Sequence, residues 1–191
     1  MTKSILLVGV GGQGTILASK LLTIGLMQSG YDVKMSEIHG MSQRGGSVSS
    51  QVRYGENVQS PVIELGGADI LVSFEKMEAL RWLEYMKPEG GMLVVNNYQI
   101  NPMPVVSGVA DYSDEILDEL EAKTSDITVV DAFAEAEALG NPKVLNIVLL
   151  GTLIKMMNLT HIDWNGIIAQ EVKPQFVEIN QKALALGLNL V

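Results

Sequence analysis

Three glycines between the first apolar run of the chain and the first helical pattern are spaced as in turns that bind phosphate. Gly9, Gly11 and Gly14 stand in the sequence Gly-Val-Gly-Gly-Gln-Gly. In such a turn the first glycine permits a sharp bend, the second lets a phosphate approach the backbone, and the third lets the helix pack closely on the strand. The start of the helix adds amide donors and the positive end of a dipole, so an anion can bind without a basic side chain. A phosphate or dinucleotide contact and a purely structural turn are both consistent with this motif.

Two further residues of the turn, Gly12 and Gln13, are candidates for contact with a cofactor. The Gln13 side-chain amide suits a carboxylate or a phosphate, and its alternative role is to cap the helix. Glu37 follows the turn by about 20 residues, where a NAD-binding dehydrogenase keeps the acid that binds a ribose hydroxyl. Glu37 therefore favours NAD. The residues from 38 to 46, however, form a glycine-rich loop rather than a connection to a second helix.

This loop carries side chains that suit anion binding and proton transfer. Arg44 offers a planar guanidinium that matches a phosphate, and its alternative role is a salt bridge to Glu37 or to a partner subunit. His39 is a candidate proton donor or hydrogen-bond partner for a substrate, and equally a structural histidine that holds the loop. The candidate cofactor-binding residues of the loop are Ser42, Gln43, Arg44 and Gly45.

For two other polar residues, Glu75 and Asn146, a functional role competes with a structural one. Glu75 directly follows an apolar run and suits contact with a ribose or an amide, but N-capping of the helix that starts at Lys76 is the favoured interpretation. Asn146 lies on a helical segment that is apolar almost all round, so its amide must be hydrogen-bonded. We expect Asn146 to hold a backbone group in place rather than to face a cleft.

The residue types that are missing limit the chemistry of this chain. It has no cysteine, which excludes disulfides, a thiolate nucleophile and an iron–sulfur cluster ligated by this chain. His39 and His161 are the only imidazoles, and they lie too far apart in sequence to form a helical metal-binding pair. We therefore expect no metal site and no redox centre held by this chain alone.

Charge and hydropathy narrow the choice of partners. The formal net charge of −9, without a cluster of lysine and arginine, makes nucleic acid an unsuitable partner. The longest apolar stretch, residues 144–157, contains Asn146 and Lys155 and is shorter than the ~20 residues that span a bilayer. The apolar run at the N-terminus is too short for a secretory signal. We expect a cytoplasmic protein that makes no contact with membranes.

The elements that must position these residues alternate between strand and helix patterns. No linker or low-complexity segment interrupts them, so we expect a single domain over residues 1–191. The predicted strands are 4–9, 32–36, 48–54, 68–74, 92–96 and 127–130. The predicted helices are 13–29, 76–85, 114–123, 144–158 and 174–186, and residues 97–110 are expected to be irregular.

Strands that are separated by helices imply parallel pairing through right-handed crossovers. The predicted fold class is therefore α/β, with a Rossmann-like, doubly wound and mostly parallel sheet that has helices on both faces. Ligands of such sheets bind beyond the carboxyl ends of the strands. This rule places the segments 9–14, 37–46 and 74–76 at the same end of the sheet, beyond the carboxyl ends of the strands.

Several of these motifs together resemble the gamma subunit or gamma domain of the 2-oxoacid:ferredoxin oxidoreductases, and the resemblance extends over essentially the whole chain. Within that family the chain is most similar to the small (beta) subunit of indolepyruvate ferredoxin oxidoreductase. The residues that carry the resemblance are Gly9-Val-Gly-Gly-Gln-Gly14, Glu37-Ile-His-Gly-Met-Ser-Gln-Arg-Gly-Gly46, Ala68-Asp-Ile-Leu-Val72 near Glu75, and Asn146 shortly before Gly151.

The resemblance implies a reaction shared with a larger partner subunit. The family decarboxylates a 2-oxoacid on thiamine diphosphate, passes electrons through [4Fe-4S] clusters to ferredoxin, and transfers the acyl group to coenzyme A. This chain has neither cysteine nor a thiamine-binding Gly-Asp-Gly pattern, so the partner must carry both cofactors. The resemblance thus implies a non-redox subunit that is inactive alone and acts on an aryl pyruvate such as indolepyruvate. Its glycine turn and 37–46 loop would complete the active-site cleft or the coenzyme A path.

Two other functions are weighed against this one. A self-contained NAD-binding dehydrogenase would use Gly9, Gly11, Gly14 and Glu37, but the sequence has no catalytic constellation beyond that half-motif. A docking or regulatory module would use the glycine-rich loop only as a protein-binding surface.

Overall fold

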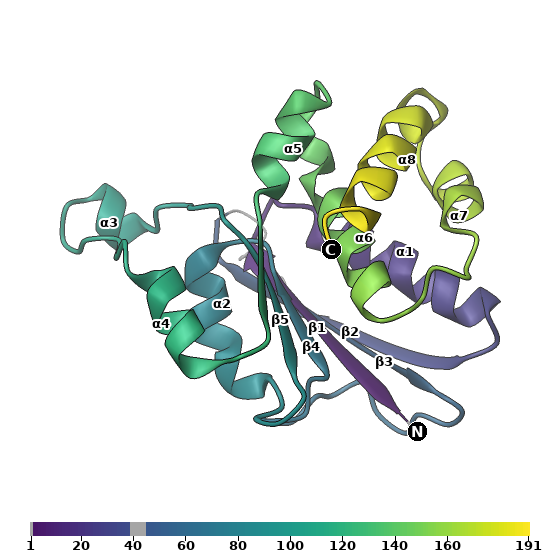
Figure 1. Ribbon diagram of the computed structural model, residues 1–191, viewed down its shortest axis with the longest axis horizontal. Helices are drawn as coiled ribbons and strands as arrows, with labels where there is room; N and C mark the ends of the chain where they lie inside the picture. Colours follow the sequence, from purple (N-terminus) through teal and green to yellow (C-terminus); the bar gives the residue numbers. More distant parts are fainter. Residues whose placement is uncertain (1, 39–44) are drawn as a thin grey trace.

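A central sheet runs through the molecule with helices on both faces (Figure 1). The computed structural model describes residues 2–38 and 45–191. In the described residues the strands are β1 (Lys3–Val10), β2 (Asp32–Ile38), β3 (Ser47–Gly55), β4 (Ile70–Ser73), β5 (Met92–Asn96) and β6 (Ile127–Val130). The helices are α1 (Thr15–Gln28), α2 (Lys76–Trp82), α3 (Met103–Val106), α4 (Ile116–Lys123), α5 (Ala132–Ala138), α6 (Leu145–Met156), α7 (Trp164–Glu171) and α8 (Pro174–Leu188).

The continuous apolar runs became strands that are buried on both faces. Because successive strand side chains point to opposite sides, Ile5 and Leu7 of β1 enter one core while Leu6 and Val8 enter the other. The first core lies under α1, α6, α7 and α8, and the second lies under α2 and α4 (Figure 1). The predicted doubly wound arrangement with helices on both faces is confirmed.

The strand order is β2-β3-β1-β4-β5-β6, and β3 runs against its two neighbours. The other pairings, β1 with β4, β4 with β5 and β5 with β6, are parallel. Only residues 39–46 lie between β2 and β3, and these two strands pair directly in the antiparallel manner of a hairpin. The sheet is therefore mostly parallel, as predicted, but an antiparallel strand lies between β1 and β2.

The boundaries differ from the sequence-based prediction in a few places. The second strand extends to Ile38 instead of ending at residue 36. The segment 97–110, expected to be irregular, contains the short helix α3, and α5 was not predicted. The helix expected at 76–85 ends at Trp82 and continues as a 3-10 turn over Leu83–Tyr85. No helix in the part of the chain that is described combines the length and apolar character needed to cross a bilayer.

A buried carboxylate, Asp69, lies directly before β4, at the opposite end of the sheet from the glycine turn. Asp69 is 6% exposed, and it accepts hydrogen bonds from the Ser4 N–H at 2.8 Å, Lys87 Nζ at 2.7 Å and Lys3 Nζ at 3.2 Å. Burial opposes the charged form, but Lys87, the Ser4 amide and Lys3 together outweigh it and lower the pKa of Asp69 below its usual 3.8.

We expect Asp69→Asn to lower the free energy of unfolding by about 2 kcal/mol at neutral pH, because it weakens charge-assisted hydrogen bonds to a buried group. Since folding lowers the pKa, this contribution is complete above the unfolded pKa and disappears as the pH falls through the folded pKa. The free energies of unfolding of the two proteins, measured in urea, should therefore converge as the pH falls below the usual pKa of 3.8 and through the lower pKa of the folded protein. The control is Glu178→Gln, whose salt bridge to Lys182 is exposed and should matter little. An Asp69→Asn effect of equal size at acidic and neutral pH would contradict the assignment.

Candidate functional site

The glycine turn at the carboxyl end of β1 is fixed by the side chain of Gln13. Its Oε1 accepts a hydrogen bond from the Val10 N–H at 2.7 Å, and its Nε2 donates to the Phe74 carbonyl at 2.8 Å. Gln13 is 8% exposed, so these bonds are shielded from water. The side chain thus ties the turn to the carboxyl end of β4. This role is structural, but it is not the capping of the helix that was considered from the sequence, because α1 has no side-chain cap.

Gly14 ends the turn as the residue that precedes α1. Its φ of 81° and ψ of 21° lie in the left-handed region, which glycine adopts without a steric penalty. Asn146 on α6, 3% exposed, donates from Nδ2 to the Gly14 carbonyl at 3.1 Å. The prediction that Asn146 holds a backbone group is therefore confirmed.

The turn retains amide groups that have no acceptor among the described residues. The Gly11 N–H donates to the Gly46 carbonyl at 2.9 Å, and the Gln13 N–H donates to the Val10 carbonyl at 3.2 Å. No described residue accepts a hydrogen bond from the N–H of Gly12 or Gly14. These two amides, at the N-terminus of a 14-residue helix, suit an anion.

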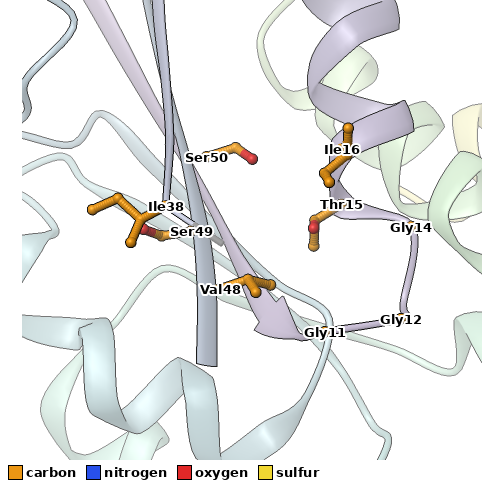
Figure 2. Close-up of a pocket in the computed structure, with 9 residues that line it drawn as sticks. All are labelled: Gly11, Gly12, Gly14, Thr15, Ile16, Ile38, Val48, Ser49 and Ser50. Atoms are coloured by element: carbon orange, nitrogen blue, oxygen red, sulfur yellow. The ribbon is translucent and has the colours of Figure 1, made fainter. Parts of the chain in front are cut away.

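A first pocket, of about 330 Å³, opens between this turn and the strands β2 and β3. Figure 2 shows Val48 and Ser50 on β3 pointing toward Thr15 and Ile16 at the start of α1, whereas Ile38 and Ser49 point away from them. The pocket is lined by Gly11, Gly12, Gly14, Thr15, Ile16, Ile38, Val48, Ser49 and Ser50.

Glu37 lies beside this first pocket but not where a dehydrogenase keeps its acid. Ser19 Oγ on α1 donates to Glu37 Oε1 at 2.7 Å. Because β3 lies between β1 and β2, Glu37 is one strand farther from β1 than the corresponding acid of a Rossmann dehydrogenase. This topology argues against a NAD site built from the glycine turn and Glu37.

The glycine-rich loop is described only at its ends. His39, Ser42, Gln43 and Arg44 lie outside the described residues, so their predicted roles stay predictions. Gly45 is described and has a φ of 87°. Beyond it, Ser47 Oγ donates to Glu78 Oε2 on α2. The segment that follows the loop is thus held both by α2 and, through the Gly46 carbonyl, by the glycine turn.

A second pocket, of about 710 Å³, opens on the other side of the turn. Its walls come from the turn, the segment after β5, and the starts of α5 and α6. The residues that line it are Gly11, Gly12, Gln13, Gly14, Leu17, Tyr98, Ile100, Phe133, Pro142, Lys143, Leu145 and Asn146. The aromatic and basic members of this set were not identified from the sequence.

Asn96, at the end of β5, connects the two sides of the second pocket. It has 0% exposure; its Nδ2 donates to the Phe74 carbonyl at 3.1 Å, and its Oδ1 accepts from the Ala132 N–H at 3.0 Å. The Phe74 carbonyl is also the acceptor for Gln13. A continuous chain of buried hydrogen bonds therefore runs from the glycine turn to the start of α5. Asn96 lies at the carboxyl end of a strand, where ligands of such sheets bind, so attention to strand ends would have identified it from the sequence.

Glu75 is a buried structural acid. It is 1% exposed, and its Oε2 accepts from the Glu78 N–H at 3.0 Å, which is the N-capping predicted for α2. Its Oε1 accepts from Tyr112 Oη at 2.5 Å and from the Ile100 N–H at 3.2 Å. Burial, together with the hydrogen bond to Glu75, raises the pKa of Tyr112 far above its usual value. Glu75 therefore holds the segment after β5 against α2.

The residues described show no cluster of three or more histidine, aspartate or glutamate side chains that would hold a metal ion. His161 lies in the turn before α7. The site thus consists of backbone amides, side-chain amides, hydroxyls, aromatic rings and one lysine. Such groups bind and orient a ligand.

Comparison with known proteins gives consistent matches. The family model described as pyruvate ferredoxin/flavodoxin oxidoreductase matches residues 4–190. Proteins named indolepyruvate oxidoreductase subunit IorB are 36% identical in Thermococcus kodakarensis and 37% identical in Pyrococcus horikoshii; each alignment covers 97% of this chain and 94% of the relative.

Solved structures share the fold at lower sequence identity. The gamma subunit of keto/oxoacid ferredoxin oxidoreductase from Geobacter sulfurreducens aligns with a TM-score of 0.70 and 22% identity over 98% of this chain and 97% of that one. The 2-oxoglutarate:ferredoxin oxidoreductase of Magnetococcus marinus, solved with 2-oxoglutarate, coenzyme A and succinyl-CoA, aligns with a TM-score of 0.75 and 17% identity. That alignment covers 99% of this chain but 31% of the longer one, so the same fold also occurs within a larger polypeptide.

Proposed function

The chain belongs to the pyruvate ferredoxin/flavodoxin oxidoreductase family, and we propose that it is the small subunit of a heteromeric 2-oxoacid:ferredoxin oxidoreductase that acts on indolepyruvate or another aryl pyruvate. The reaction is an oxidative decarboxylation that yields an acyl-CoA, CO₂ and reduced ferredoxin. The relatives named as indolepyruvate oxidoreductase subunits support the substrate class.

The division of labour follows from the residues that this chain offers. A thiolate-ligated cluster needs cysteine, and the chain has none. The [4Fe-4S] clusters, which conduct electrons to ferredoxin, are therefore assigned to a larger partner subunit. Thiamine diphosphate, which supplies the decarboxylation chemistry, is assigned to the same subunit because this chain has no Gly-Asp-Gly pattern. The small subunit acts in the cytoplasm as a non-redox part of this complex.

The observation that carries the proposed role is the glycine turn with a pocket on each side. The Gly12 and Gly14 amides suit a phosphate, and coenzyme A is the phosphate-bearing co-substrate of the reaction. We assign to the turn a place on the coenzyme A path, in a cleft completed by the partner. In this role Gln13 and Asn146 keep the turn rigid, so that its amides are oriented before the ligand arrives. Ser42, Gln43 and Arg44 belong to the same proposed contact surface.

The proposal predicts that the purified chain alone has no activity. Co-expression with the larger subunit should yield a complex that reduces ferredoxin in the presence of an aryl pyruvate and coenzyme A. The larger subunit without this chain should lose most of that activity, because one wall of its cleft would be missing. The measurement is 2-oxoacid-dependent ferredoxin reduction by the three preparations at equal concentration of the larger subunit. Full activity of the larger subunit alone would overturn the proposal.

A further inference from the structure

Two aromatic rings stack on each other in the wall of the second pocket. Tyr98 follows β5 and Phe133 lies in the first turn of α5; their rings stack with centroids 4.6 Å apart and planes inclined by 22°. Both residues line the pocket, and both are half-buried. The Tyr98 carbonyl accepts from the Lys76 N–H at 3.0 Å, and Asn96 fixes the start of α5. These hydrogen bonds hold the backbone of the two segments that carry the rings.

Lys143 adds a positive charge to the same pocket. Its side chain is exposed, and it forms no ion pair with any residue that the structure describes. Other lysines, such as Lys3, Lys20 and Lys87, are each paired with a carboxylate. In a chain with a net charge of −9, an unpaired lysine beside a pocket is available to an anion from outside.

The third wall of the pocket is the glycine turn itself. Gly12 and Gly14 offer the amides described above, and Asn146, 3% exposed, forms part of the floor. The volume of about 710 Å³ lies within the range of small-molecule sites. Mostly apolar walls with a few polar groups that converge on one side are typical of a site for a ligand with one flat and one charged part.

We propose that this pocket binds a ligand in which a flat aromatic ring is joined to an anionic group, with the ring against Tyr98 and Phe133 and the anion at Lys143 and the glycine turn. Two ligands of the proposed reaction have this chemistry: an aryl 2-oxoacid, and the nucleotide part of coenzyme A. The inference deepens the proposed function and takes its two candidate ligands from it.

The test measures binding to the full chain by calorimetry with two probes, indolepyruvate and adenosine 3′,5′-bisphosphate. We expect one of them to bind, and the one that binds identifies the source of the ligand. Lys143→Gln should weaken that binding by about tenfold, because it removes a charge-assisted contact. Tyr98→Leu should weaken it by a similar factor through the loss of the stacking surface. Lys143 is exposed, and Tyr98 lies in the loop after β5, so both variants should fold.

The matched control for charge is Lys155→Gln, because Lys155 is also exposed and unpaired among the described residues but lies outside the pocket. It should leave the affinity unchanged. The neutral analogues indole and adenosine should bind more weakly than the charged probes, and Lys143→Gln should not affect them.

Absence of binding by both probes at millimolar concentration would overturn the inference. Equal effects of Lys143→Gln and Lys155→Gln would overturn it as well. The readout is binding by this chain, whereas the proposed function is tested by turnover of the complex. A failure of one is therefore distinguishable from a failure of the other.

Discussion

Replacing Gly187 with alanine is expected to lower the free energy of unfolding by about 3 kcal/mol, although alanine favours a helix over glycine by about 1 kcal/mol. Gly187 lies on α8 where this helix crosses α6. A Cβ atom at this position would overlap the Val148 carbonyl oxygen and would lie 3.1 Å from the Gly151 Cα. Because these neighbours are backbone atoms of α6, no side-chain rotation relieves the overlap, and the two helices must move apart.

The measurement is urea denaturation at neutral pH, followed by circular dichroism. The control is Ala185→Gly, which lies on the exposed side of the same helix and should cost about 1 kcal/mol through helix propensity alone. The two changes thus alter helix propensity in opposite directions, whereas only Gly187→Ala introduces an overlap. A Gly187→Ala protein that is as stable as the wild type would show that α6 and α8 do not pack at Gly187.

The strands and most helices followed from local sequence patterns. Residues 92–96 and 127–130 were predicted as strands and form β5 and β6 with the same boundaries. Continuous apolar runs are reliable indicators here because both faces of this sheet are covered by helices. The short helix α5 was missed because its Ala and Glu residues indicate a helix through propensity and show only a weak apolar period.

The position of β3 is a long-range property. The sequence of residues 47–55 does not show that this strand pairs with β1 as well as with β2. Strand order depends on how all the strands and helices of the domain pack together. The sequence did contain a signal for its direction, because the short connection over residues 39–46 has fewer residues than a parallel crossover needs. This single strand changes the interpretation of Glu37, which follows the dinucleotide-binding pattern in sequence but not in space.

The site was predictable in part. Gln13 and Asn146 both support the glycine turn. The structural role of Asn146 was predicted, but its partner, the Gly14 carbonyl, was not. Tyr98 and Phe133 closely follow β5 and β6, and attention to the carboxyl ends of these strands would have found them. Lys143 precedes α6 and reaches the pocket only through tertiary packing, so its spacing in the sequence carried no signal.

Gly14→Ala is expected to cost about 3 kcal/mol of folding free energy through two separate effects. The φ of 81° is strained by about 1–2 kcal/mol for a residue with a Cβ atom. The added Cβ would also lie 2.6 Å from Asn146 Nδ2 and 3.0 Å from its Cγ. Asn146 must then move, and its hydrogen bond to the Gly14 carbonyl is lost, which costs about 1–3 kcal/mol for a buried amide.

Gly12→Ala separates these two effects. Gly12 has a φ of 104°, but a Cβ atom there meets no heavy atom of the described residues within 4 Å, so only backbone strain remains. Urea denaturation should therefore rank Gly14→Ala as less stable than Gly12→Ala. In the double variant Gly14→Ala/Asn146→Ala the overlap is removed, so the two substitutions should cost less together than the sum of their separate effects. If Gly14→Ala and Gly12→Ala are equally stable, or if the double variant is additive, then α6 does not support the turn, and the second pocket loses the wall on which its proposed ligand depends.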